Sequence, residues 1–322
     1  MGGGNGRTDL PSRAAIVATA HEAIAKGSKS FAAASLLFDR KTREHAWLLY
    51  AWCRRCDDLA DGQEYGHDLS AVPDPAARLE LIRQLTDAAL AGETVGDPAF
   101  DALRIVAAET KLPHHFVHDL IEGFRLDLEE WGPRSEDDLY RYCYHVAGAV
   151  GCMMAVAMGV SPDDEDTLDR ACDLGMAFQL ANIARDVEED DRGGRCYLPE
   201  EWLVEMDMPP GQHMKPPFRH RLSVLAKRLV DRADAFEASA RLGTTRLGLR
   251  SAWAVLAAAG IYGAIGREVV ARGDHAWDHR ARTSAVAKIG WIARALAEAV
   301  RRHRLYPPAP RDPDLWTRPR ER

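Results

Sequence analysis

The sequence predicts an all-α fold, and three observations favour it. No stretch of the 322 residues shows sustained alternation of apolar and polar residues, the pattern of a half-buried strand. Residues 175–194 instead place amides and carboxylates on one face of a helix with apolar flanks. The longest apolar runs, 146–160 and 252–266, are shorter than the ~20 residues that span a bilayer, and glycines interrupt both. We therefore expect them to be buried core helices.

Start and stop signals divide the chain into helices of ordinary length. A first helix over 13–26 should end at Gly27, and Asp39 can cap a second helix that runs to Asp61. Ser135, with Asp138 three residues later, resembles a capping box at the start of another. The remaining helices are expected at residues 75–91, 98–110, 113–131, 135–159, 161–193, 199–206, 218–241, 248–272 and 284–304.

The ends of the chain differ in composition from its middle. Residues 1–12 are rich in glycine, which predicts disorder. Residues 307–322 are rich in proline and arginine, which predicts an extended strap or a disordered tail. Because no long linker interrupts residues 13–306, we expect them to form a single domain.

Charge and cysteine content narrow the function classes. The net charge of −7 argues against a nucleic-acid-binding protein. The N-terminal residues contain no apolar segment of the kind found in signal peptides, so we expect a cytoplasmic protein with reduced thiols. The Cys53–Cys56 pair has CxxC spacing, but no second pair accompanies it, so both thiols are expected to pack as small apolar groups.

The stretch 175–194 carries the strongest chemical signal. On a helix, Gln179, Asn182, Asp186 and Asp190 fall within about 80° of one another. Aspartates four residues apart repel each other on a helix, so a cation should lie between them. Mg²⁺ is held in proteins by one or two carboxylates together with substrate phosphates. This face therefore predicts a magnesium–phosphate site.

A second stretch repeats the pattern. Tyr50, Arg54, Asp57 and Asp61 lie within about 60° of one another on a helix. The planar guanidinium of Arg54 suits phosphate oxygens. A single DxxxD motif arises often by chance on exposed helix faces. The alternative interpretation, two exposed acidic patches, does not explain why the amides Gln179 and Asn182 lie within an apolar stretch. The pair of motifs favours metal binding.

Other polar residues allow two interpretations each. Ser28 and Ser30, with Lys29 between them, follow a helix end and could contact phosphate. When these residues are considered without the other motifs, ordinary helix capping is the favoured interpretation. Tyr142 either reaches into a cavity or packs as an aromatic side chain. Tyr262 is a polar exception on a small-residue helix face.

The chain resembles the squalene/phytoene synthase family over residues 13–304. The segments that carry the resemblance are GSKSF, YAWCRRCDDLAD, YCYHVAGAVG, FQLANIARDVEEDDRGGRCYLP and AWDHRARTS, at residues 27–31, 50–61, 142–151, 178–199 and 276–284. The resemblance implies the isoprenoid synthase fold, a helical bundle around a central apolar cavity. It also implies head-to-head condensation of two geranylgeranyl diphosphates, through prephytoene diphosphate, to phytoene, the first committed step of carotenoid biosynthesis.

The resemblance also assigns roles to individual residues. It implies Mg²⁺, with Mn²⁺ as the alternative ion, held by carboxylates and an amide on two helices; these are Asp57, Asp61, Asn182, Asp186 and Asp190. The aspartates, with two cavity tyrosines, form the implied catalytic set; these tyrosines are Tyr50 and Tyr142. It implies substrate contacts at Ser28, Ser30, Arg54, Gln179, Asn182, Arg185, Tyr262 and Arg280.

Alternatives remain open at this stage. A relative that uses two farnesyl diphosphates to make squalene or dehydrosqualene would carry the same motifs, since cavity length decides the substrate. A cyclase or chain-elongating prenyltransferase could also carry DDxxD, and a non-catalytic family member could serve as an assembly factor. No nicotinamide cofactor is expected. Because the product is a hydrocarbon, we expect peripheral association with the inner face of the membrane, where downstream carotenoid enzymes are further candidate partners.

Overall fold

The protein is described by a computed structural model over residues 11–61 and 74–320, which gives every side chain except those of Lys29, Ser30 and Asp61. Within these residues the chain forms helices, turns and loops, and no strand occurs among them. The predicted all-α class is therefore confirmed. Residues 1–10, most of the segment predicted to be disordered, lie outside the described part, as do residues 62–73.

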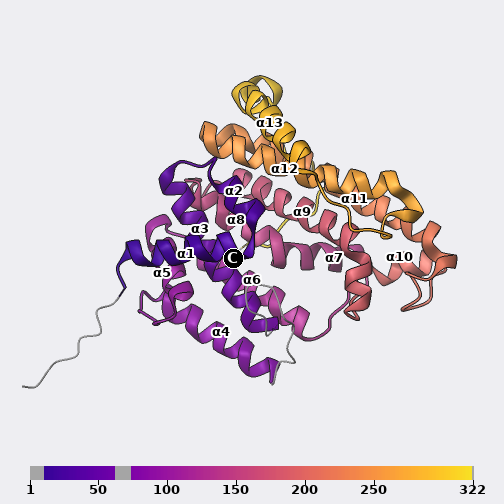
Figure 1. The fold of residues 1–322 in the computed structure, drawn as a ribbon, viewed down its shortest axis with the longest axis horizontal. Helices are drawn as coiled ribbons and strands as arrows, with labels where there is room; N and C mark the ends of the chain where they lie inside the picture. The colour runs from indigo at the N-terminus through magenta and orange to yellow at the C-terminus, as the bar shows by residue number, and fades with distance from the viewer. Residues whose placement is uncertain (1–10, 62–73, 321–322) are drawn as a thin grey trace, which may run out of the picture. The chain divides into compact units, whose positions relative to one another are not determined.

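The chain divides by its internal contacts into two compact units. The first comprises Met1–Leu36 and Arg40–Leu112, and the second comprises Leu37–Asp39 and Pro113–Arg322. The expectation of a single domain over residues 13–306 stays a prediction. The helices of the first unit, labelled in Figure 1, are α1 (Arg13–Gly27), α2 (Lys29–Ser35), α3 (Arg40–Asp61), α4 (Pro75–Leu90) and α5 (Pro98–Thr110).

Helix α3 is the centre of the first unit and packs against α1, α4 and α5. Its buried face carries Leu48, Trp52 and Cys56, which repeat every four residues as on one side of a helix. Burial raises the pKa of the Cys53 thiol to about 12, which suppresses the thiolate that redox or metal chemistry needs. All six cysteines of the chain are free, as expected.

Helix α2 is a difference from the predicted secondary structure. Residues 29–35 form a short helix, where no helix was predicted from the sequence. Ser28 is its N-cap, and its hydroxyl accepts a hydrogen bond of 3.3 Å from the backbone N–H of Phe31. The capping interpretation of Ser28 is therefore confirmed, because the hydroxyl satisfies a backbone donor that the first helical turn leaves open.

The second unit contains the remaining helices. They are α6 (His114–Leu128), α7 (Glu136–Cys143), the π-helical turn η1 (Tyr144–Gly148), α8 (Ala149–Ala157), α9 (Glu165–Arg192), α10 (Glu200–Glu205), α11 (Arg219–Gly243), α12 (Leu249–Arg272) and α13 (Ala285–Leu305), with short 3₁₀ turns η2 (Pro216–Phe218), η3 (Thr244–Arg246) and η4 (Gly273–His275).

Helix α9 runs through the second unit and packs against α8, α11 and α12, whose ribbons surround it in Figure 1. Its approach to η1 requires glycine. A Cβ atom on Gly175 would lie 2.2 Å from the carbonyl oxygen of Ala147, and one on Gly151 would lie 2.3 Å from that of Ala171. This close approach of α9 to η1 and α8 fixes the position of the polar face that follows Gly175.

Several helix boundaries differ from the expectation, among them the end of α6, at Leu128 rather than at residue 131. Helix α9 begins at Glu165 rather than at residue 161, because Asp164 is its N-cap and accepts from the backbone N–H of Thr167. The helix expected over 135–159 is interrupted by the π-helical turn η1. Hydrophobic periodicity does not distinguish one π-helical turn from α-helix, so this turn could not be predicted.

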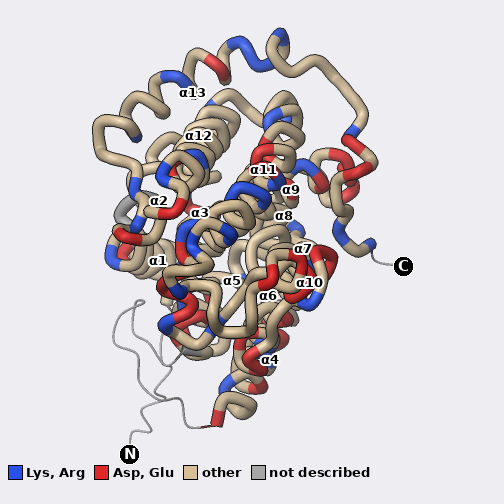
Figure 2. Tube along the Cα trace, turned by 90° about the vertical axis from the view of Figure 1, so that its right-hand side faces the viewer, with Lys and Arg blue, Asp and Glu red and all other residues tan. Residues whose placement is uncertain are grey.

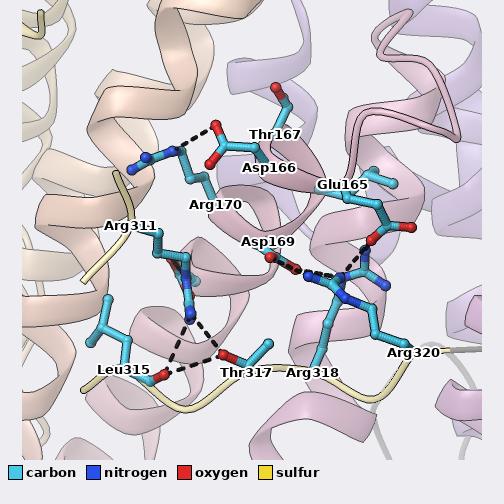
Figure 3. A network of polar contacts seen from close by, with 12 residues as sticks. Glu165, Asp166, Thr167, Asp169, Arg170, Arg311, Leu315, Thr317, Arg318 and Arg320 are labelled. Carbon is cyan, nitrogen blue, oxygen red and sulfur yellow. Dashed lines mark hydrogen bonds and ion pairs between the residues drawn. The ribbon is translucent and has the colours of Figure 1, made fainter. Parts of the chain in front are cut away.

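The C-terminal tail lies as an extended strap along the N-terminal half of α9. Figure 3 shows Arg318 and Arg320 of the strap directed at Glu165 and Asp169 of this helix. Arg311 pairs with the fully buried Asp173 at 2.7 Å, and Arg320 pairs with Asp169 at 2.5 Å. Of the two predicted states of the tail, the strap is therefore the one observed for residues 307–320.

One helical segment, Leu249–His275, is long and apolar enough to cross a membrane by length and composition. It comprises α12 and the turn η4, and α12 packs against α9, α11 and α13. This packing agrees with the predicted role of residues 252–266 as part of a helical core.

Candidate active site

The predicted polar face of α9 exists and is half-buried. Gln179, Asn182, Asp186 and Asp190 all have intermediate exposure, between the fully buried Leu180 and Ala184. Among the described residues, neither amide side chain has a hydrogen-bond partner. Amides placed this way can accept a ligand without first breaking an internal bond.

Two arginines neutralise the first aspartate of this face. Arg185 binds Asp186 through two hydrogen bonds, one of 2.7 Å, and Arg280 approaches the same carboxylate at 2.9 Å. Arg280 also lies 3.4 Å from Glu189. Burial would raise the pKa of Asp186, but the hydrogen bonds and charge of Arg185, together with the charge of Arg280, hold it below its usual value. Asp186 is therefore ionised at neutral pH.

A tryptophan anchors the segment that brings Arg280 to α9. Trp277 is buried and donates from its indole nitrogen to the backbone oxygen of Ala184, at 3.0 Å. This bond attaches the connector between η4 and α13 to the middle of α9, three residues before Arg280. This contact could not be predicted from the sequence, because it joins residues 93 positions apart.

The second aspartate behaves differently. Burial and the negative charge of Asp186 raise the pKa of Asp190 to about 7, although Arg195 opposes the shift. Asp190 borders a small cavity that Arg195, Tyr197 and His213 also line. Two neighbouring carboxylates without a cation disfavour each other's ionised form, and this is the electrostatic signature expected of a pair that binds a divalent ion.

A hydrogen-bonded cluster beside this face includes a residue that sequence reasoning missed. Asp127 of α6 accepts from the hydroxyl of Tyr142 at 2.9 Å and from that of Tyr197 at 3.0 Å. The two rings stack with centroids 4.7 Å apart. Burial and the charge of Asp127 raise the pKa of Tyr142, so the phenol stays protonated. The charge of Asp127 also contributes to the raised pKa of Asp190, which places Asp127 near the α9 face.

Tyr262 of α12 lies on the same side of the unit as Arg185. Its ring stacks on Phe178 with centroids 4.2 Å apart. Its electrostatic effect on Arg185 indicates that the two side chains are close. The structure thus groups Tyr142, Arg185, Tyr262 and Arg280 around the polar face of α9.

The polar face of α3 belongs to the first unit. Arg54 pairs with Asp57 at 2.8 Å and with Asp58 at 2.5 Å. Asp57 is the more exposed partner, with 42% of its side chain accessible, whereas Asp58 is buried. Asp57 is therefore the more accessible of the two carboxylates, while Asp58 orients Arg54.

The remaining predicted residues of the first unit lie near α2. The ring of Tyr50 makes an edge contact with Phe31, with centroids 5.6 Å apart. A Cβ on Gly27 would lie 2.4 Å from the Tyr50 hydroxyl, so the glycine leaves room for the phenol. The side chains of Ser30 and Asp61 lie outside the described residues, and their roles stay predictions.

The donor set fits a hard divalent cation. Its members are carboxylates and an amide, which are the oxygen ligands that Mg²⁺ and Mn²⁺ take. No group of three or more His, Cys, Asp or Glu side chains in the described part of the chain is arranged to hold an ion by itself.

Comparison with known proteins identifies the family. The family model for squalene/phytoene synthases matches residues 24–287. The chain belongs to the squalene/phytoene synthase family. It is 45% identical to the 15-cis-phytoene synthase of Pantoea ananas, with 92% of this chain and 96% of that protein covered. It is 46% identical to the 15-cis-phytoene synthase of a Paracoccus species, with 94% and 98% covered.

A solved structure supports the same assignment of fold. A dehydrosqualene synthase in complex with a ligand superposes with a TM-score of 0.78 at 26% identity, over 88% of this chain and 96% of that one. The fold of this squalene/phytoene synthase family member is therefore the isoprenoid synthase helical fold that the sequence resemblance implied.

Proposed function

We propose that this protein is a 15-cis-phytoene synthase, a prenyltransferase that condenses two geranylgeranyl diphosphates head to head through prephytoene diphosphate and releases two diphosphates. Its similarity to two 15-cis-phytoene synthases over more than nine-tenths of the chain supports this substrate. The observation that carries the chemistry is the α9 face, where Asp186 and Asp190 adjoin two arginines.

The arginines would bind the leaving group. Arg185 and Arg280 now pair with Asp186, and Arg54 pairs with Asp57. Asp57, Asp61, Asn182, Asp186 and Asp190 would hold Mg²⁺, which supplies Lewis-acid stabilisation of negative charge on the departing diphosphate. With these carboxylates bound to a cation, Arg185, Arg280 and Arg54 would be available to the diphosphate oxygens. Arginine suits this exchange because its planar fork binds carboxylate and phosphate in the same way.

The tyrosines and apolar residues would control the allylic cation. Departure of diphosphate from an allylic carbon leaves an allylic cation. Water would quench this cation, so the residues beside the cation must exclude solvent. Tyr142 is buried, keeps its proton and is fixed by Asp127, so it can present a ring and a neutral hydroxyl at a constant position. Tyr50 and Tyr262 are the further aromatic residues that we assign to the substrate cavity.

The deciding experiment supplies geranylgeranyl diphosphate and Mg²⁺ without a nicotinamide, followed by analysis of the hydrocarbons. We expect a C40 product with the mass and spectrum of phytoene. A parallel reaction with farnesyl diphosphate tests the alternative to which the structural similarity to a dehydrosqualene synthase points. A C30 product formed faster than the C40 product would overturn the proposed substrate. Absence of diphosphate release from either substrate would favour a non-catalytic assembly factor.

The product and substrate also suggest where the enzyme works. Both carry long hydrocarbon chains that partition into bilayers, so we propose a cytoplasmic protein that associates peripherally with the inner face of the membrane. Downstream enzymes that consume the hydrocarbon would meet it there.

A further inference from the structure

Helix α13 has apolar residues on the face that its own unit leaves uncovered. It packs against α12, where Trp291 contacts Gly260 and Trp253 donates to the backbone oxygen of Ile292 at 2.8 Å. A helix that covers a core on one side normally exposes a polar face on the other. Here the outward residues include Val286 and Ile289, which are 80% and 68% exposed.

These exposed residues form a continuous stripe. At 100° per residue they fall within an arc of about 100°, opposite the buried Ala295 and Ala299. The stripe consists of Val286, Ile289, Ala293, Leu296, Ala297 and Val300. With 21 residues the helix is about 30 Å long, so the stripe runs over most of its length.

The charges of α13 are almost all positive. Figure 2 shows α13 at the outer edge of the second unit, beside α12, with blue turns and one red turn. The red turn is Glu298, which faces inward, 13% exposed, and pairs with Arg241. Outside the stripe and at its end lie the exposed cations Arg294, Arg301 and Arg304. The outward face therefore carries no carboxylate, although the whole chain has a net charge of −7.

We propose that this face of α13, the α13 stripe, docks the enzyme on an anionic lipid surface. An apolar stripe flanked by cations is the composition of helices that lie in the plane of a membrane interface. Each cation near an anionic membrane surface strengthens binding by about fivefold. A second copy of the chain fits less well, because symmetric pairing of two α13 stripes would bring the same cations together. The reason for the enzyme to bind a membrane rests on the proposed function, whereas the location of the docking surface is inferred from the exposed residues of α13.

The test is sedimentation of the full chain with vesicles, measured without substrate. We expect the wild-type protein to bind phosphatidylcholine–phosphatidylglycerol vesicles and to bind pure phosphatidylcholine weakly. Ile289→Gln with Val300→Gln should weaken binding about tenfold. Arg301→Gln with Arg304→Gln should weaken binding about tenfold or more, and only where the vesicles are anionic.

Matched controls use exposed valines on other helices of the same unit. Val204 of α10 is 74% exposed and Val224 of α11 is 41% exposed. Val204→Gln with Val224→Gln should leave vesicle binding unchanged. Equal binding by the stripe variant and wild type would overturn the proposal, as would an equal loss in this control pair. So would a stripe variant that changed the oligomeric state in light scattering but not vesicle binding, because the occupant would then be a second copy.

Turnover separates this proposal from the proposed function. The stripe variant, folded by circular dichroism, should still convert geranylgeranyl diphosphate dispersed in detergent at the wild-type rate, because the α13 stripe lies outside the polar faces of α3 and α9. A protein that binds anionic vesicles through the stripe but forms no hydrocarbon would refute the proposed function alone. A protein that forms phytoene in detergent without binding vesicles would refute the docking surface alone.

Discussion

Arg280 lies 2.9 Å from Asp186, although the two residues are far apart in the sequence. The connector that follows η4 therefore completes the charge balance of the α9 face. Trp277 holds this connector in place through its bond to Ala184. Because Arg280 and Arg185 share one carboxylate, the pKa of Asp186 depends on both arginines.

Arg280→Gln should shift the pH dependence of turnover. Removing the positive charge raises the pKa of Asp186, because Arg280 now helps to lower it. The acidic limb of kcat/KM should therefore move to higher pH, and KM should rise about tenfold as a diphosphate contact is lost. Lys227→Gln is the control, since Lys227 pairs with Asp231 on the exposed surface of α11. An unchanged acidic limb would contradict the role of Arg280.

Asp186→Ala and Asp57→Ala should each reduce diphosphate release by about 10³-fold or more while the helical circular dichroism is kept. Each loses a carboxylate that we assign to the cation. Glu188→Gln is the matched control on α9, because Glu188 pairs only with Arg192 one turn later among the contacts described. Near-wild-type turnover in either aspartate variant would end the metal assignment at that position.

Asp190→Asn should stabilise the protein without added metal at pH 8 but not at pH 4. The folded-state pKa of Asp190, about 7, exceeds the ordinary value of 3.8, so the folded state binds the proton more tightly than the unfolded chain. Stability from this group is present below pH 4 and is lost as the pH rises to 7. We expect the variant to gain about 1–2 kcal/mol at pH 8. Denaturant unfolding in EDTA at pH 8 and pH 4 measures the free energy of unfolding of both proteins. An equal difference between variant and wild type at the two pH values would contradict the raised pKa of Asp190.

Mg²⁺ binding should weaken as the pH falls below 7. The ion competes with the proton of Asp190, so affinity should decrease up to about tenfold for each pH unit. Isothermal titration with Mg²⁺ and inorganic diphosphate at pH 6, 7 and 8 would measure it. In Asp190→Asn the pH dependence should largely disappear while weak binding remains. Identical pH dependence in both proteins would exclude Asp190 as the titrating ligand.

Arg311→Met should destabilise the protein by about 3–5 kcal/mol, because it leaves the fully buried Asp173 without its cationic partner. Asp173→Asn in the same chain should recover part of the loss, since the amide needs no counter-charge. Arg320→Ala, at a 41% exposed side chain, should cost at most about 1 kcal/mol. Chemical unfolding measures all three. Equal losses for Arg311→Met and Arg320→Ala would contradict the strap as a buried anchor.

The sequence predicted most of the fold because its signals are local. Caps and glycines placed the boundaries of α1, α4 and α5 within one residue. Helix α2 was missed because its seven residues give too few turns for a periodic pattern. The π-helical turn η1 was missed because a single π-helical turn within a helix leaves the hydrophobic periodicity almost unchanged.

The candidate site divides in the same way. Helical periodicity alone determined that Asp186 and Asp190, and likewise Arg54 and Asp57, share helix faces, since covalent geometry fixes residues one turn apart. Only the tertiary structure decided that Arg280 neutralises Asp186, that Asp127 holds Tyr142, and that α13 leaves an apolar stripe uncovered. These relationships join segments distant in the chain, and the packing of helices against one another, rather than any local rule, brings such segments together.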